Sequence, residues 1–232
     1  MKLLKPGDPC PCCGNPLPEG LPTEIMNLLG WMADRSDRCS ETEENDKMKE
    51  ERNMEHENSK NCLRDVPAGE CVKIGEWEFA VLEQMDEGTA VILKDLLIEK
   101  KEFGRKNNYD GSYVDRSCRE FAEKLIAAVG DDCLVEHEVD LTSDDGLKDY
   151  GSVRRTVSLL TADRYRKYVE ILDRWNPRKW WWLATAWSTP RHGSSYGVKC
   201  VAPSGLIYGV YCYDGLGVRP FCIFKSEIFV SI

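Results

Sequence analysis

The sequence predicts an α+β fold for most of the chain, on three observations. Residues 72–97 contain two runs rich in Val, Ile, Phe and Trp around "MDEGT", which is the pattern of a β-hairpin and its turn. Residues 112–130 and 161–175 carry apolar side chains at helical spacing, and the alternating segment 133–141 between them predicts a strand. From Trp180 onward the chain is strand-like and is broken at "STPRHGSS", "PSG" and "YDGLG". A hairpin, two helices around a strand and then several strands fit an α+β domain.

Both predicted helices have an apolar stripe and recognisable ends. The stripes consist of Phe121, Leu125 and Val129 in the first helix, and of Tyr165, Val169 and Leu172 in the second. Gly130 is expected to end the first helix, because glycine adopts the backbone conformation that closes a helix. Thr161 or Asp163 is expected to cap the start of the second helix.

The run "WWWLATAW", which begins at Trp180, raises the question whether these rings form a core or an exposed platform. Strand alternation gives two faces, one with Trp180, Trp182, Ala184 and Ala186 and the other with Trp181, Leu183, Thr185 and Trp187. Both faces are largely apolar, which indicates a strand that is covered on both sides. We therefore expect a central structural strand, with ligand contacts in the polar segment that follows, Ser188 to Gly193.

Composition limits the class of protein. The chain has 232 residues, a hydrophobic fraction of 42% and a formal net charge of −9. An acidic chain does not attract phosphate backbones by bulk electrostatics, so a general nucleic-acid binder is not expected. No apolar run approaches the roughly 20 residues of a membrane span, and the N-terminus lacks the apolar region of a signal peptide. The expected location is the cytoplasm, without membrane association.

The composition along the chain predicts three parts. Residues 1–34 combine a segment rich in Cys, Pro and Gly with a short helix, and residues 35–67 are a charged connector, either a solvated helix or disordered. Residues 68–232 form the α+β domain.

A cysteine motif, "CPCCG", lies in the first part. Cys10 and Cys13 have the spacing of half a zinc ribbon, so a structural Zn²⁺ ion is a possible cofactor. Four ligands are needed, and the residues considered for the remaining positions are Cys12, Cys39, His56, Cys62 and Cys71. A tight turn with reduced thiols and a redox-active pair are the alternatives.

No motif for catalysis is present, among them a nucleophile elbow, a P-loop and the HExxH zinc motif. The aspartates after Asp140 resemble a calcium loop, but position 12 is Gly151 instead of glutamate, so the EF-hand interpretation fails. We expect His137 to be a strand residue beside solvent, and His192 to lie in a polar loop. The sequence therefore predicts a protein that is not an enzyme.

The stretches "WWWLATAWSTP" and "GVRPFCIFKSEI" resemble the signature segments of the DUF6273 family, a family of uncharacterised bacterial domains. "VKIGEWEFAVLEQ" and "SLLTADRYRKY" are similar to the opening hairpin and the central helix entry of that family, so the resemblance covers residues 72–232. The leader "LKPGDPCPCCG" is similar to leaders found on this domain in Firmicutes and their mobile elements. This chain has Ala184-Thr185-Ala186 where many relatives carry Arg-Ser-Pro.

The resemblance implies a fold similar to formylglycine-generating enzymes and C-type-lectin-like proteins, in which the final strands display ligand-contacting side chains. Transferred to this sequence, the ligand-binding residues would be Trp187, Arg191, His192, Tyr196, Tyr208, Tyr211 and Tyr213. Tyrosines beside arginine, histidine and serine are typical of recognition surfaces. The alternative is that these tyrosines only pack a sheet edge.

Three functions follow from these observations. The first is a non-enzymatic binding module, with a protein partner favoured and a glycan as the other option. The second is a phage or mobile-element inhibitor of a host defence factor, for example an anti-CRISPR-type protein whose acidic surface occupies a basic nucleic-acid groove. The third, an oxidoreductase of the formylglycine-generating type, is disfavoured because the paired cysteines of those enzymes are absent. The sequence gives no oligomeric state.

Overall fold

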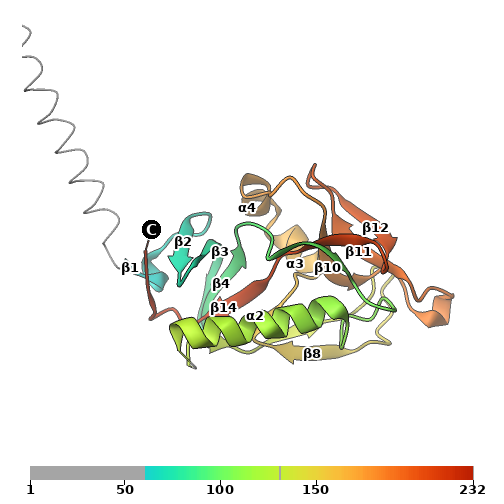
Figure 1. The fold of residues 1–232 in the computed structure, drawn as a ribbon, viewed down its shortest axis with the longest axis horizontal. Helices are drawn as coiled ribbons and strands as arrows, with labels where there is room; N and C mark the ends of the chain where they lie inside the picture. Colours follow the sequence, from blue (N-terminus) through green and yellow to red (C-terminus); the bar gives the residue numbers. More distant parts are fainter. Residues whose placement is uncertain (1–60, 131, 232) are drawn as a thin grey trace, which may run out of the picture. The chain divides into compact units, whose positions relative to one another are not determined.

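A computed structural model of the chain describes residues 61–130 and 132–231, which belong to one compact unit of mixed α and β structure. Two sheets form the middle layer, and the helix α2 (Tyr113–Val129) covers one of its faces (Figure 1). The short helices α3 (Ala162–Lys167) and α4 (Val169–Arg174) cover the other face. The α+β class predicted from the sequence is therefore confirmed.

The first sheet has six strands and contains the predicted hairpin. Its strands are β2 (Cys71–Ile74), β3 (Trp77–Met85), β4 (Gly88–Leu93), β14 (Phe221–Phe224) and β6 (Leu134–Val135), in that order, with β9 (Val157–Ser158) also paired to β14. The turn between β3 and β4 is Asp86-Glu87, within the predicted "MDEGT". Every residue of β4 and β14 is buried, because both faces of this part of the sheet are covered.

The second sheet has five strands and contains the tryptophan run. Its order is β12 (Ile207–Tyr211), β11 (Gly197–Val201), β10 (Trp181–Ala186), β13 (Gly215–Val218) and β5 (Ile98–Glu102). All six residues of β10 are buried, as predicted for a central strand. Trp182 packs in the core beneath α2, and Trp181 packs in the core beneath α3 and α4. Trp180 and Trp187 flank β10 and are 40% and 50% exposed, so only the middle of the run is core.

Two small sheets complete the fold. One pairs β1 (Asn61–Cys62) with β15 (Phe229–Val230), and the other pairs β7 (His137–Asp140) with β8 (Ser152–Arg155). Leu63, the first residue of the short 3₁₀ helix η1 (Leu63–Asp65), and Val66, which follows that helix, are fully buried. The described fold therefore includes residues 61–67, which the sequence assigned to the charged connector.

The helix α2 matches its prediction closely. Ser112 caps its first turn by accepting a hydrogen bond from the backbone N–H of Asp115, and Gly130 ends it with φ of +113°. Phe121 and Leu125 are buried on the predicted stripe.

The second predicted helix is divided at Tyr168 into α3 and α4. The side chain of Thr161 caps α3, as one of the two predictions had it. Tyr168 leaves helical geometry, and its hydroxyl donates to the carboxylate of Glu83 at 2.6 Å. Because the axis breaks here, Val169 is 42% exposed, and its predicted place on the buried stripe is wrong.

The predicted strand 133–141 is also divided, since β6 and β7 belong to different sheets. His137 is the first residue of β7 and is buried at 5% exposure, so the prediction that it lies beside solvent is wrong. Its ring contacts Phe221 edge to face and is 2.9 Å from the hydroxyl of Ser158. Burial lowers the pKa of His137 to about 3, and it is neutral at physiological pH.

Candidate functional site

The candidate site is built around Trp187, the first residue after the buried strand β10. Its backbone N–H donates to Gly197 O on β11, which continues the ladder by one residue beyond β10. The indole lies over two glycines on neighbouring strands, Gly197 and Gly209. A Cβ on Gly209 would lie 2.2 Å from Trp187 Cε3, and a Cβ on Gly197 would lie 2.9 Å from Trp187 Cβ. Only glycine at both positions leaves room for the ring.

The ring is fixed from below and open above. The ammonium of Lys199, on the same face of β11, lies 4.5 Å from the ring centroid, which is a cation–π contact. That ammonium also pairs with Asp144 at 3.0 Å, although the Lys199 side chain is only 9% exposed. Trp187 itself remains 50% exposed. A large ring held at one position and half exposed gives contact area at low entropic cost.

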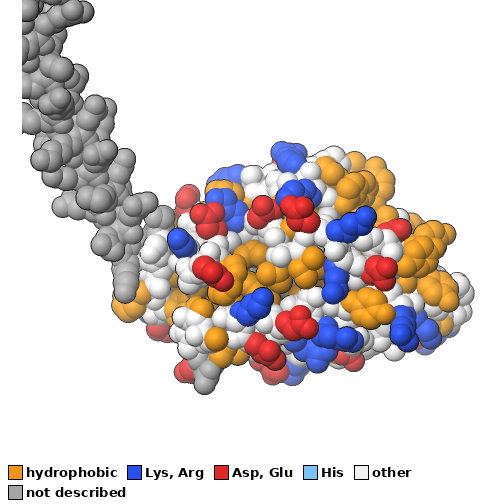
Figure 2. Space-filling view, viewed as in Figure 1, with side chains coloured by type: hydrophobic (Ala, Val, Ile, Leu, Met, Phe, Trp, Pro, Cys, Tyr) orange, Lys and Arg blue, Asp and Glu red, His pale blue; other side chains and the backbone are white. Residues whose placement is uncertain are grey.

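A cavity of about 440 Å³ opens beside this ring. Its lining consists of Trp187, Gly193, Ser194, Tyr196, Gly197, Gly209, Val210 and Tyr211. None of these residues is charged, and their polar groups are hydroxyls, backbone amides and the indole N–H of Trp187. Tyr213 stacks on Tyr211 with parallel planes, 9° apart, and a centroid distance of 5.2 Å. Figure 2 shows hydrophobic side chains gathered at the end of the molecule where β11 and β12 lie.

The segment after Trp187 is attached to the acidic loop 142–151. Ser188 donates to Asp145 at 2.6 Å, and His192 Nδ1 lies 3.0 Å from the same carboxylate oxygen. Hydrogen bonds from Ser143 and Ser188 hold the pKa of Asp145 well below its usual range. Asp145 is therefore ionised at neutral pH. The loop 142–151, which resembles a calcium loop in sequence but lacks the required glutamate, therefore helps to shape the site.

Two further residues of the segment, Thr189 and Arg191, are held in the same way by Asp149. Thr189 donates to one oxygen of this carboxylate at 2.6 Å, and the guanidinium of Arg191 pairs with the other. Asp145 and Asp149 of the loop thus bind side chains of the segment after Trp187, and Asp144 pairs with Lys199 of β11.

Asn107 joins the two ends of the segment. Its side-chain amide donates to Ser188 O at 2.8 Å and to Gly197 O at 3.0 Å, and its own oxygen accepts from the hydroxyl of Tyr150 at 2.6 Å. Its backbone N–H donates to Ser195 O. Asn107 is fully buried, so these bonds do not compete with water. The loop around Trp187 therefore has a fixed shape.

The structure brings only some of the predicted ligand residues together. Trp187, Tyr196 and Tyr211 line the cavity and Tyr213 stacks beside them. Tyr208 lies on the opposite face of β12, edge to face with Trp180 at 5.5 Å.

Arg191 and His192 lie on the short 3₁₀ helix η2 (Pro190–His192) and do not line the cavity. Sequence reasoning missed Gly197, Gly209 and Asn107. An isolated glycine in a strand can signal the close approach of another group. Nothing local marks Asn107, because its side-chain partners lie 43 to 90 residues away.

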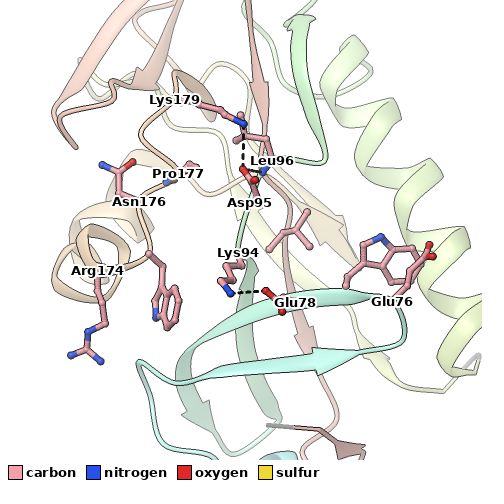
Figure 3. Close-up of a pocket in the computed structure, with 12 residues that line it drawn as sticks. Glu76, Glu78, Lys94, Asp95, Leu96, Arg174, Asn176, Pro177 and Lys179 are labelled. Carbon is pink, nitrogen blue, oxygen red and sulfur yellow. Dashed lines mark hydrogen bonds and ion pairs between the residues drawn. The ribbon is translucent and has the colours of Figure 1, made fainter. Parts of the chain in front are cut away.

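A second cavity, of about 570 Å³, lies between β3, the end of β4 and the end of α4 (Figure 3). Its charged side chains are largely paired with each other. Lys94 donates to Glu78 at 2.6 Å, and Lys179 lies 3.8 Å from Asp95. Compensated ion pairs at a surface typically contribute little energy and leave no net charge for a ligand. We assign this cavity no binding role.

The predicted zinc ligands Cys10 and Cys13 lie outside the described residues. Of the residues considered to complete the site, Cys62 and Cys71 lie within them, on β1 and β2. Within residues 61–130 and 132–231, no group of three or more His, Cys, Asp and Glu side chains could hold a metal ion.

No helix within the described part of the chain is long and apolar enough to cross a membrane. Comparison of the sequence with protein-family models and with curated proteins finds no match.

Proposed function

We propose that this protein is a binding module that recognises a protein partner through the surface formed by Trp187, Tyr196, Tyr211 and Tyr213, called here the aromatic surface. The observation that carries the proposal is the position of Trp187, half exposed and held over Gly197 and Gly209 beside an uncharged cavity. Packing alone does not account for this position. A tryptophan that only filled the core would be covered, and a mobile tryptophan would not need glycines beneath its ring. Aromatic side chains of this kind dominate the binding energy of protein interfaces.

The C-type-lectin-like arrangement and membership of the DUF6273 family belong to the same proposal. Both rest on the sequence resemblance and on its agreement with the position of the aromatic surface, which follows the tryptophan strand. A glycan is the other ligand considered for this surface, because hydroxyls and aromatic rings line the cavity.

An inhibitor that occupies a basic groove finds less support at this surface. Such an inhibitor needs carboxylates that are available to a partner's Lys and Arg side chains. The nearby carboxylates of Asp144, Asp145 and Asp149 already have partners within the protein. An oxidoreductase of the formylglycine-generating type remains disfavoured by the missing cysteine pair.

The test is an affinity pull-down from a bacterial lysate with three forms of the full chain, read by quantitative mass spectrometry. The forms are wild type, Trp187→Ala and Val169→Ala, the last being a control at another half-exposed apolar side chain. We expect one protein to be retained by wild type and Val169→Ala and to be lost with Trp187→Ala. A partner retained equally by all three forms would exclude the aromatic surface as the binding site.

A further inference from the structure

Among residues 61–130 and 132–231, β12 is an edge strand of the five-stranded sheet, because β11 is its only neighbour there. The stretch "LIYGVYCY", residues 206–213, contains no charged residue and no proline. Natural edge strands are usually protected by lysine, proline, a bulge or a covering element, since an open edge pairs with other chains. Within the described residues, the part of β12 from Ile207 to Gly209 carries none of these protections. An unprotected apolar edge therefore indicates a place where another strand binds.

The register shows which backbone groups of β12 are open. Ala202 N donates to Leu206 O at 2.9 Å, just before β12 begins, and Cys212 N donates to Tyr196 O at 2.7 Å, just after it ends. Hydrogen-bonded pairs alternate with non-bonded pairs in an antiparallel ladder, so the backbone groups of Ile207 and Gly209 point away from β11.

The next residue of the same parity, Tyr211, is closed. Its N–H donates to the Asp214 carboxylate at 3.0 Å, and its carbonyl accepts from Asp214 N at 2.9 Å. The open part of the edge is thus short, with two donors and two acceptors on Ile207 and Gly209.

Exposed aromatic rings lie on both faces of this open edge. Trp187 lies over Gly209 on one face, and Tyr211 projects from the same face. Tyr208 projects from the other face and contacts Trp180. A strand added to β12 would direct successive side chains alternately to these two aromatic clusters.

We infer that the partner binds by strand addition, as an extended and uncharged segment of polypeptide hydrogen-bonded to Ile207 and Gly209. This inference rests on the proposed function and specifies its binding mode. Main-chain hydrogen bonds supply part of the affinity, and the aromatic clusters select apolar side chains at alternate positions.

The observations favour a peptide over the other possible occupants. A glycan has no repeating N–H and C=O groups at the spacing of a strand. A second copy of this chain would meet β12 over a short edge, whereas stable interfaces between folded proteins bury about 1,200–2,000 Å². A flexible peptide can follow both the edge and the cavity beside Trp187.

The experiment uses a displayed library of random dodecapeptides, selected on the full wild-type chain. The enriched peptide is then synthesised with a single N-methyl group at each backbone amide in turn, and its affinity is measured by calorimetry. Strand addition predicts a loss of about tenfold or more at every second amide and little change at the amides between them. This readout uses the unaltered protein and does not depend on how a variant folds.

Two variants at one position provide the matched pair. Ile207→Pro removes the outward N–H of an edge residue, which leaves the hydrogen bonds to β11 in place, and Ile207→Ala removes the same side chain but keeps that N–H. We expect the proline variant to bind at least about tenfold more weakly than the alanine variant, with equal melting temperatures for the two.

Any of four results would overturn the inference. The first two are a selection that enriches no peptide over the Ile207→Pro variant, and a methylation profile without a period of two. The third is a dimer of the wild type that Ile207→Pro dissociates and Ile207→Ala does not, and the fourth is a neutral glycan that Trp187→Ala releases but Ile207→Pro retains. If the methylation profile lacks the period while Trp187→Ala still abolishes peptide binding, strand addition fails and the proposed function stands. If Trp187→Ala has no effect on any ligand, the proposed function itself fails.

Discussion

The guanidinium of Arg219 lies over the indole of Trp181, 5.2 Å from the ring centroid, and both side chains are fully buried. Arg219 Nε donates to Leu93 O at 2.8 Å, and Nη2 donates to Lys94 O at 3.1 Å and to Trp175 O at 2.7 Å. Burial lowers the pKa of Arg219 to about 10, so the side chain is charged at neutral pH. The "GVRP" and "WWW" stretches are therefore one structural unit that ties the end of β4 to the end of α4.

The first prediction concerns this unit. Arg219→Lys should lower the free energy of unfolding by about 2–4 kcal/mol, because an ammonium cannot reach three carbonyls with the geometry of a guanidinium. Urea unfolding followed by fluorescence measures the loss. Arg116→Lys, at an exposed position on α2, is the control and should change stability by less than about 0.5 kcal/mol. Equal stability of Arg219→Lys and wild type would show that the bonds to Leu93, Lys94 and Trp175 are dispensable.

Much of the fold could be predicted because its elements carry two-sided or periodic apolar patterns. The strand β10 is apolar on both faces since helices cover both faces of its sheet, and this pattern is visible in the sequence. The helix α2 has both a stripe and end signals. The division of residues 161–175 was not visible, because Tyr168, where the helix breaks, bonds to Glu83, 85 residues away.

The candidate site divides in the same way. The exposed tyrosines could be named from composition, but they were predicted as one set although strand alternation places Tyr208 and Tyr211, three residues apart, on opposite faces. Which of the two faces borders the cavity could not be predicted, because it depends on the position of Trp187 over Gly209 of another strand. The burial of His137 was missed for a related reason, since Phe221, the ring that covers it, comes 84 residues later.

The second prediction separates core from surface within the tryptophan run. Trp182 is fully buried, packs against Phe103 at 5.4 Å and donates from Nε1 to Lys101 O at 2.8 Å. Trp182→Ala should therefore destabilise the protein by about 3–5 kcal/mol. Trp187→Ala should cost less than about 1.5 kcal/mol, since half of that ring is already in water. Thermal unfolding of both variants is the measurement, and similar losses would contradict the division.

The third prediction concerns the clamp formed by Asn107, whose side chain donates to both Ser188 O and Gly197 O. Asn107→Ala removes one donor from each of the carbonyls of Ser188 and Gly197 and the acceptor of the Tyr150 hydroxyl, which should cost about 2–4 kcal/mol. The loop should also exchange its amide hydrogens faster, and binding by the aromatic surface should weaken although Trp187 is unchanged. Hydrogen exchange read by mass spectrometry measures the first effect.

The control for the clamp is the next residue. Asn108→Ala removes one exposed bond to Asp110 N and should leave loop exchange unchanged. Unchanged exchange in Asn107→Ala would mean that the bonds of Asp145 and Asp149 hold the loop without the clamp.

The fourth prediction concerns pH. His137 has a folded pKa of about 3, below the usual histidine value of 6.5, because burial disfavours its charged form and the nearby charges of Arg164 and Arg154 add to this effect. As the pH falls below about 6.5 the unfolded chain binds a proton that the folded chain does not. The stability contributed by neutral His137 is therefore complete above this pH and decreases by about 1.4 kcal/mol per pH unit until about pH 3.

The measurement compares wild type with His137→Gln by urea unfolding between pH 7.5 and about pH 4.5. Carboxylates such as Asp145 titrate in both proteins, so their contribution cancels in the difference. We expect the stability of wild type relative to the variant to be constant above about pH 6.5 and to fall below it, by about 2 kcal/mol at pH 5. Parallel curves would mean that His137 accepts a proton inside the fold, which its position between Ser158 and Phe221 argues against.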